Sequence, residues 1–149
     1  MSLVDLLTED MKAAMKDKEG GKKRLSVIRM VRSSLKNVEI EKKHELSDEE
    51  VLEVLSREVK KRKDSIDEYA NLGRQDISDG LREEVEILMK YLPEQMSEEE
   101  IRSIVNQVVA AVKPTGPKDM GKVMGKLMPM VKGKADGKLV NQIVKEIIG

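Results

Sequence analysis

Apolar residues recur at intervals of three and four along nearly the whole chain, which is the pattern of amphipathic α-helices. Seven segments show this pattern, four before Pro93 and three after it. Their apolar stripes begin at Leu3, Leu25, Leu52, Leu81, Ile101, Met120 and Leu139. The sequence therefore predicts an all-α fold.

Capping residues and helix breakers set the expected boundaries of these segments. Ser2, Ser47 and Ser97 each precede an acidic residue three positions later, which is the capping-box pattern of a helix N-terminus. The first helix is expected to end at residues 20–21, and Gly73 is expected just after the third. The second, third and fourth helices are expected at about residues 22–43, 48–72 and 79–92, and residues 114–117 should separate the fifth helix from the sixth.

A boundary between two parts of the chain is expected at Pro93. This proline ends a helix, and residues 91–96 form a connection too short to be a flexible tether. We therefore predict an N-terminal domain resembling a four-helix bundle at residues 1–93. A small three-helix tail domain is predicted at residues 97–149.

The composition excludes several classes of site. Cysteine is absent, so disulfides, thiolate zinc sites and cysteine nucleophiles are excluded. The single histidine, His44, lies among charged residues near an expected helix end and is best explained as a solvated cation. Neither a P-loop nor a dinucleotide-binding fingerprint occurs. We therefore expect no catalytic residue, no metal and no cofactor.

The expected cellular compartment rests on signals that the sequence lacks. The first residues are acidic within five positions and lack a long apolar run, so no secretory signal is recognised. No apolar segment approaches the length of a transmembrane helix. The sequence thus favours a soluble cytoplasmic protein without a membrane partner.

Positive charge is concentrated toward the C-terminus. Residues 1–95 carry 19 Lys/Arg and 22 Asp/Glu, whereas residues 96–149 carry 9 and 6. From Lys113 onward the counts are 8 and 3. Such asymmetry indicates a polyanion-binding end. Two other basic groups, the second-helix residues 29–43 and the run at 60–63, are weaker candidates, and the run at 60–63 is expected to be solvated and paired along its helix.

The sixth helical segment carries an unusual polar face. At 100° per residue, Lys118, Lys122 and Lys126 form one row opposite the apolar stripe, with Gly121 and Gly125 beside it. Each glycine costs a helix about 1 kcal/mol relative to alanine. Two explanations stay open: a phosphate backbone approaches the glycines closely, or a neighbouring helix packs against them.

The residues after this helix carry further groups that could contact a nucleic-acid backbone. The backbone N–H groups of residues 133–137 and the polar side chains of Asn141 and Gln142 suit phosphate and ribose contacts. No aromatic residue is available in this region to stack splayed bases, so the pattern favours folded RNA recognised by its shape. Asp136 is expected to cap the last helix itself, which argues against an anion site there.

Two runs, residues 119–125 and 132–141, closely resemble the YqeY family, as do residues 91–93 and 60–64. The same module forms the tail of the B subunit of the tRNA-dependent amidotransferase. The resemblance implies a helical bundle followed by a tail that contacts the tRNA body. Carried over to this chain, the candidate RNA-binding residues are Lys118, Gly121, Lys122, Gly125, Lys126, Gly133, Lys134 and Lys138.

The resemblance does not imply catalysis by this chain. The domain that activates the carboxylate and the glutaminase with its nucleophilic serine have no counterpart among these residues, so a label of carbon–nitrogen ligase with glutamine as amido donor would be inherited. The hypothesis is a non-catalytic module that binds tRNA or structured RNA. The alternative is a protein-interaction or accessory module for tRNA amidation, with the amidotransferase or aminoacyl-tRNA machinery as partner.

Overall fold

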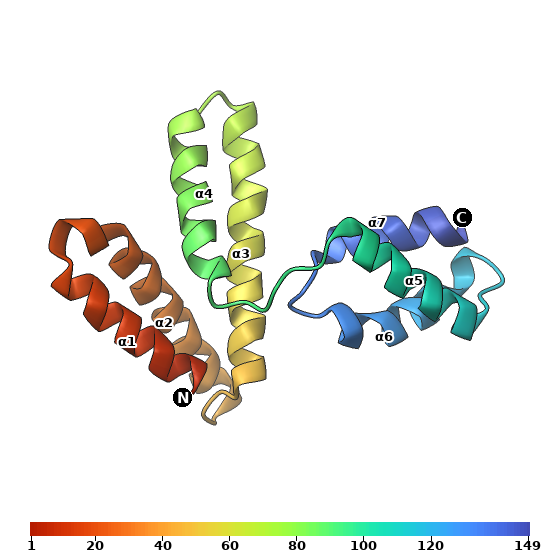
Figure 1. The fold of residues 1–149 in the computed structure, drawn as a ribbon, viewed down its shortest axis with the longest axis horizontal. Helices are drawn as coiled ribbons and strands as arrows, with labels where there is room; N and C mark the ends of the chain where they lie inside the picture. Colours follow the sequence, from red (N-terminus) through yellow and green to blue (C-terminus); the bar gives the residue numbers. More distant parts are fainter. The chain divides into compact units, whose positions relative to one another are not determined.

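The computed structural model describes residues 1–149 and consists of helices without any strand, which confirms the predicted all-α fold (Figure 1). The chain divides into two compact units, Met1–Leu92 and Pro93–Gly149, and each is described by itself. The first unit contains α1 (Leu3–Lys16), α2 (Lys22–Lys42), α3 (Asp48–Asn71) and α4 (Gln75–Met89). The second contains α5 (Glu98–Val112), α6 (Met120–Val131) and α7 (Gly137–Ile148).

In the N-terminal unit, α1 and α2 form one antiparallel pair and α3 and α4 form another (Figure 1). A 3₁₀ turn at Lys18–Gly21 joins the first pair. The helices enclose one aliphatic core, whose fully buried members include Leu7, Ile28, Val31, Val51, Leu55 and Leu88. The turn is tight because a Cβ atom at Gly21 would overlap the carbonyl oxygen of Ala14.

Several predicted helix ends are confirmed, but α1 ends at Lys16, before the expected residues 20–21, because the 3₁₀ turn occupies the interval. Ser2 and Ser47 form reciprocal capping boxes, and the Ser97 hydroxyl oxygen accepts a hydrogen bond from the backbone N–H of Glu100. Gly73 has a φ of 76°, and the next backbone N–H, that of Arg74, donates to the carbonyl oxygen of Tyr69 at 2.8 Å. This left-handed glycine ends α3 in the expected way.

The fourth helix was predicted at about residues 79–92. In the structure it begins at Gln75 and ends at Met89. Its first turn is held by a contact that is distant in sequence. Ser78 is fully buried, and its hydroxyl donates to the Ile66 carbonyl oxygen of α3 at 3.2 Å. Tertiary packing against α3 therefore supports a turn that the apolar pattern of α4 does not predict.

Arg62 corrects the expectation that residues 60–63 are a solvated run. Its neighbours in the run are exposed, but Arg62 keeps 6% of its surface exposed because it lies on the inner face of α3 with Val59 and Ile66. Its guanidinium donates to Glu58 at 2.8 Å and to Glu84 of α4 at 3.1 Å. Arg62 is thus a polar link inside the N-terminal unit.

The C-terminal unit has a separate core of aliphatic residues from α5, α6 and α7. Its fully buried members include Ile101, Val105, Val123, Leu127, Val140, Ile143 and Val144. A 3₁₀ turn at Pro117–Asp119 leads into α6, so Pro117 begins this turn and the α-helix starts at Met120. No helix anywhere in the chain is both long and apolar enough to cross a membrane.

Candidate nucleic-acid interface

Helix α6 is oriented by its apolar stripe. Val123, Leu127 and Val131 are buried to 1% exposure or less, as the periodicity predicts. Because these residues face the core, Lys122 and Lys126 lie on the solvent side of the helix together with both glycines. The C-terminal unit therefore presents the Lys/Gly face, defined as Lys118, Gly121, Lys122, Gly125 and Lys126, to its surroundings.

The two glycines of this face are open. A Cβ atom placed on Gly121 or Gly125 would meet no heavy atom within 4 Å. Neither α5 nor α7 of the C-terminal unit therefore packs against these glycines. Their cost to helix stability has no compensating contact within the C-terminal unit, and a close approach from outside this unit remains as an explanation.

The lysines of the face differ in how far their charge is compensated. The ammonium of Lys122 lies 3.8 Å from the Asp119 carboxylate, which also accepts hydrogen bonds from the backbone N–H and the hydroxyl of Thr115. Those hydrogen bonds lower the pKa of Asp119 below its ordinary value. Lys118 and Lys126 are exposed and make no ion pair. Both ammonium groups can therefore bind an external anion without breaking an ion pair within the protein.

Gly133 has a structural role that its place in the predicted site did not reveal. Its φ is 75°, a conformation that glycine adopts without strain, and it lies in the turn between α6 and α7. The Gln95 side-chain amide donates to the Gly133 carbonyl oxygen at 2.9 Å, and the Met96 N–H donates to that of Lys134 at 2.8 Å. The turn is thus fixed to the segment before α5.

The other predicted residues lie beyond α6. Lys134 is an exposed turn residue, and its backbone N–H donates to the Val131 carbonyl oxygen and is not free for a ligand. Lys138 lies in the first turn of α7, where its N–H donates to the Asp136 carboxylate at 3.1 Å. Asp136 caps α7 as expected, so the N-terminus of this helix is already occupied by a carboxylate.

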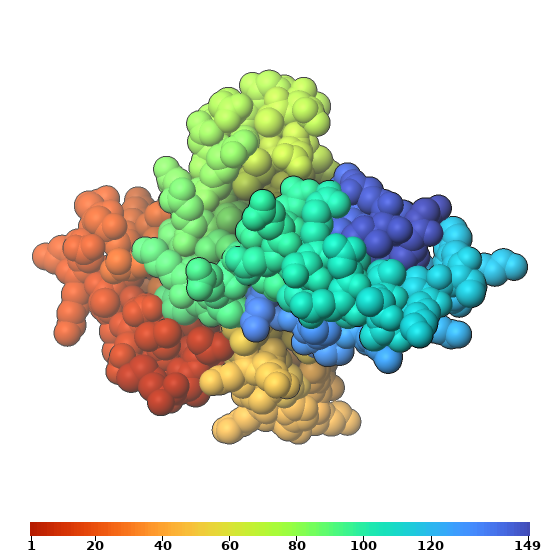
Figure 2. All heavy atoms as spheres, turned by 45° about the vertical axis from the view of Figure 1, so that its right-hand side comes forward, coloured from red at the N-terminus to blue at the C-terminus, as the bar shows by residue number.

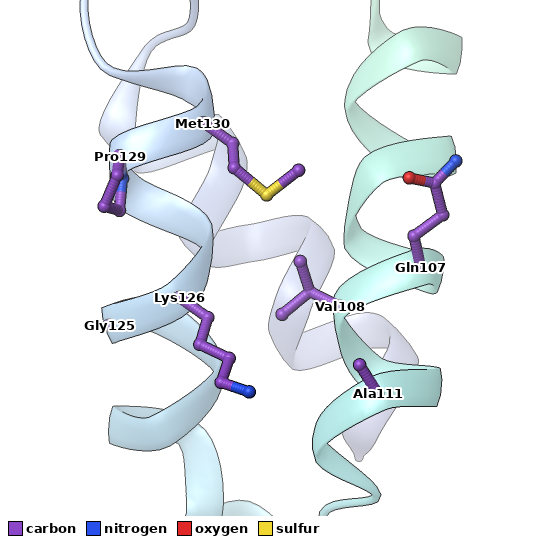
Figure 3. Close-up of a pocket in the computed structure, with 7 residues that line it drawn as sticks. All are labelled: Gln107, Val108, Ala111, Gly125, Lys126, Pro129 and Met130. Carbon is purple, nitrogen blue, oxygen red and sulfur yellow. The ribbon is translucent and has the colours of Figure 1, made fainter.

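The sequence did not reveal a groove between α5 and α6. It has a volume of about 370 Å³, is broadly open to solvent and borders the Lys/Gly face through Gly125 and Lys126. Figure 3 shows the Lys126 and Met130 side chains extending from α6 toward α5. The remaining lining residues are Gln107, Val108, Ala111 and Pro129.

Neither the histidine nor the carboxylates of the chain form a candidate metal site. His44 is exposed, with its Nε2 atom 3.6 Å from the Glu50 carboxylate, consistent with a solvated surface residue. No group of three or more histidine, aspartate or glutamate side chains is placed to hold a metal ion.

Three proteins with a shared name are similar to this chain. The "Altered inheritance of mitochondria protein 41, mitochondrial" of Kluyveromyces lactis is 36% identical over 115 residues, which cover 74% of this chain and 60% of that protein. The proteins of the same name from Candida glabrata and Lachancea thermotolerans are 35% and 33% identical. Their matches cover 62% and 74% of this chain. The chain spans between half and three fifths of the length of these relatives.

These names contradict the expectation of a cytoplasmic protein, because all three relatives are named as mitochondrial. That expectation was wrong in its reasoning as well, since it rested on signals that were not found. The absence of a secretory or membrane-spanning pattern does not assign a compartment.

The family follows from a match that runs through both units. It covers residues 4–148, and the matching family is described as "Yqey-like protein". Neither this description nor the name of the relatives mentions a reaction. The chain belongs to the YqeY family.

Proposed function

We propose that the C-terminal unit docks on structured RNA, with tRNA as the first substrate to test, and that the Lys/Gly face makes the contact. The observation that carries this proposal is the pair of open glycines beside Lys118 and Lys126, two exposed lysines that make no ion pair. A phosphate backbone can approach a helix closely where Cβ atoms are missing, and lysine ammonium groups can then reach its oxygens.

The form of the RNA follows from the residue types at the face. The C-terminal unit contains no aromatic residue that could stack an unpaired base. Lysines and exposed backbone instead suit the phosphates and riboses of a folded RNA. Because few lysines neutralise few phosphates, binding should be modest and should weaken steeply as salt rises.

This role needs no catalytic group in the chain. A docking module would hold an RNA substrate while another protein performs the chemistry, as the resemblance to the amidotransferase tail suggests. We therefore place the protein beside tRNA amidation or aminoacylation as an accessory. Because the relatives are named as mitochondrial, organellar tRNA belongs in the assay beside total tRNA.

The test is binding of the full chain to tRNA, with three lysines reversed in the variant Lys118→Glu, Lys122→Glu and Lys126→Glu. A matched control reverses Lys12, Lys16 and Lys22, which are exposed lysines of the N-terminal unit, and changes the net charge equally. We expect saturable binding by the wild type and the control, and its loss in the Lys/Gly-face variant.

Two results would overturn the proposal. Equal loss in both variants would show that overall charge, not the α6 face, determines binding. No binding of tRNA by the wild type at low salt would remove RNA as the ligand.

A further inference from the structure

The groove between α5 and α6 has an apolar floor that no part of the C-terminal unit covers. Val108 and Ala111 form its α5 side, and Pro129 and Met130 form its α6 side (Figure 3). Met130 keeps 44% of its surface exposed. Exposed apolar surface of this kind, gathered at one place, marks interaction sites more often than isolated apolar residues do.

One charged side chain, that of Lys126, lines the groove. Residues 103–112 of α5 contain no charged side chain, and α6 contains Lys122 and Lys126 as its charged residues. Arg102, the next charge along α5, is already bridged to Glu98 and Glu146 at 2.9 and 2.8 Å. Lys126 lines the groove without an acidic partner. An occupant should therefore combine apolar groups with negative charge.

The shape and lining narrow the occupant further. The groove is too open to be a small-molecule site, because such a site normally buries most of the surface of its ligand. In the space-filling view, α5 lies along the surface of the C-terminal unit (Figure 2). The floor is aliphatic and carries no aromatic platform for a nucleobase. Aliphatic side chains projecting from a partner surface fit this arrangement best.

We propose that this groove docks an acidic amphipathic helix of a partner protein. The apolar stripe of that helix would insert between Ala111 and Met130, and its flanking carboxylates would pair with Lys126 and Lys122. Methionine adapts to differing side chains, and the missing Cβ of Gly125 leaves the α6 wall low enough for insertion. This site is separate from the proposed RNA function, although both use Lys126.

The probe is a synthetic helical peptide with one leucine stripe flanked by glutamates. It is titrated into the full chain carrying ¹³C-labelled methionine methyl groups. We expect saturable shifts of the Met130 methyl signal, while those of Met128, which does not line the groove, and of Met15 and Met30 in the N-terminal unit stay unchanged. Peptides with the leucines changed to serine, or the glutamates changed to lysine, should not produce these shifts.

Two glycine variants test whether the peptide binds in the groove. Gly125→Leu fills the α6 wall, whereas Gly121→Leu adds the same side chain to the same helix outside the groove lining. Both positions are open, so both variants should fold, which the methyl spectrum checks. Gly125→Leu should raise the Kd for the peptide by roughly tenfold or more, and Gly121→Leu should leave it unchanged.

The proposal is overturned if the Met130 signal does not move, if the lysine peptide binds as well as the glutamate peptide, or if both glycine variants weaken binding equally. It is also overturned if an RNA duplex shifts Met130 and the acidic peptide does not, since the groove would then belong to the RNA surface. Loss of tRNA binding in the Lys118→Glu variant with peptide binding intact would show that the two sites act separately.

Discussion

At the scale of single residues, the partner of a side chain decides its role more than its neighbours in sequence do. Arg62 stands in a run of four cations, and by composition alone it resembles the other three. Its partner Glu84 is 22 positions away and belongs to another helix, so no local pattern could predict the contact. Burial would raise the pKa of Glu58, but the hydrogen bond from Arg62 and the charge of Lys61 outweigh it and lower that pKa.

Removing the Arg62 side chain should destabilise the N-terminal unit strongly. In the Arg62→Ala variant, Glu58 and Glu84 stay partly buried without their cation, and we expect a loss of about 2–4 kcal/mol. Lys63→Ala, at an exposed position of the same helix, should change stability by less than about 0.5 kcal/mol. Both tyrosines lie in this unit and tryptophan is absent, so tyrosine fluorescence during urea unfolding measures it selectively. Equal effects of the two variants would contradict the role assigned to Arg62.

Glu50 should make the N-terminal unit sensitive to acid. The hydrogen bond from Lys42 and then that from the Ser47 backbone lower the pKa of Glu50 from 4.5 to about 2. Because the folded state holds this group ionised, its contribution to stability is complete above pH 4.5 and is lost as the pH falls toward 2. Glu50→Gln keeps a capping residue but removes the titration. Its urea midpoint should therefore fall less across this range than that of the wild type.

At the scale of elements, periodicity predicted the buried side of α6 correctly, because the spacing of Val123, Leu127 and Val131 within this one helix decides which side is apolar. The openness of its glycines and the groove beside α5 depend on which helices come together, and the sequence does not encode these relations locally. Gly133 is an intermediate case. A glycine there signals a turn, but its attachment to residues 95–96 appears only in the folded unit.

The junction of α1 and α2 should depend on one glycine. A Cβ at Gly21 would overlap the backbone of Ala14, so Gly21→Ala must displace a helix end and should cost about 1–3 kcal/mol. The adjacent Gly20→Ala is the control, since its Cβ would meet the flexible Asp17 side chain at 3.2 Å. Urea unfolding followed by tyrosine fluorescence compares them, and a tolerated Gly21→Ala would refute the tight turn.

Helix α6 should become more stable when its open glycines are filled. Gly121→Ala and Gly125→Ala should each slow hydrogen exchange in α6 by an amount equivalent to about 0.5–1 kcal/mol, because alanine favours helix and meets no obstacle. Gly133→Ala should have the opposite effect, since its φ of 75° strains other residues. Weaker tRNA binding by the stabilised glycine variants would link the open glycines to function. Faster exchange in them would contradict the open face.

At the scale of the whole molecule, the chain consists of two units with separate aliphatic cores, and the basic excess lies in the second. The helical class, the capped helix starts and the family could be predicted from sequence because caps, apolar stripes and motifs are local. The assignment of the eight predicted residues to an RNA surface stays a prediction. Their chemistry fits several polyanions, and neither the fold nor the family description names a ligand.

The most direct test of the central claim is the salt dependence of tRNA binding by the wild type and by the variant with Lys118, Lys122 and Lys126 reversed to glutamate. Each phosphate contact contributes a slope of about 0.9 to the logarithm of affinity against the logarithm of salt concentration. The account predicts a saturable wild-type isotherm and a slope lower by about two to three in any binding that the variant retains. Equal affinities and equal slopes for the two proteins would contradict the claim that α6 contacts the RNA.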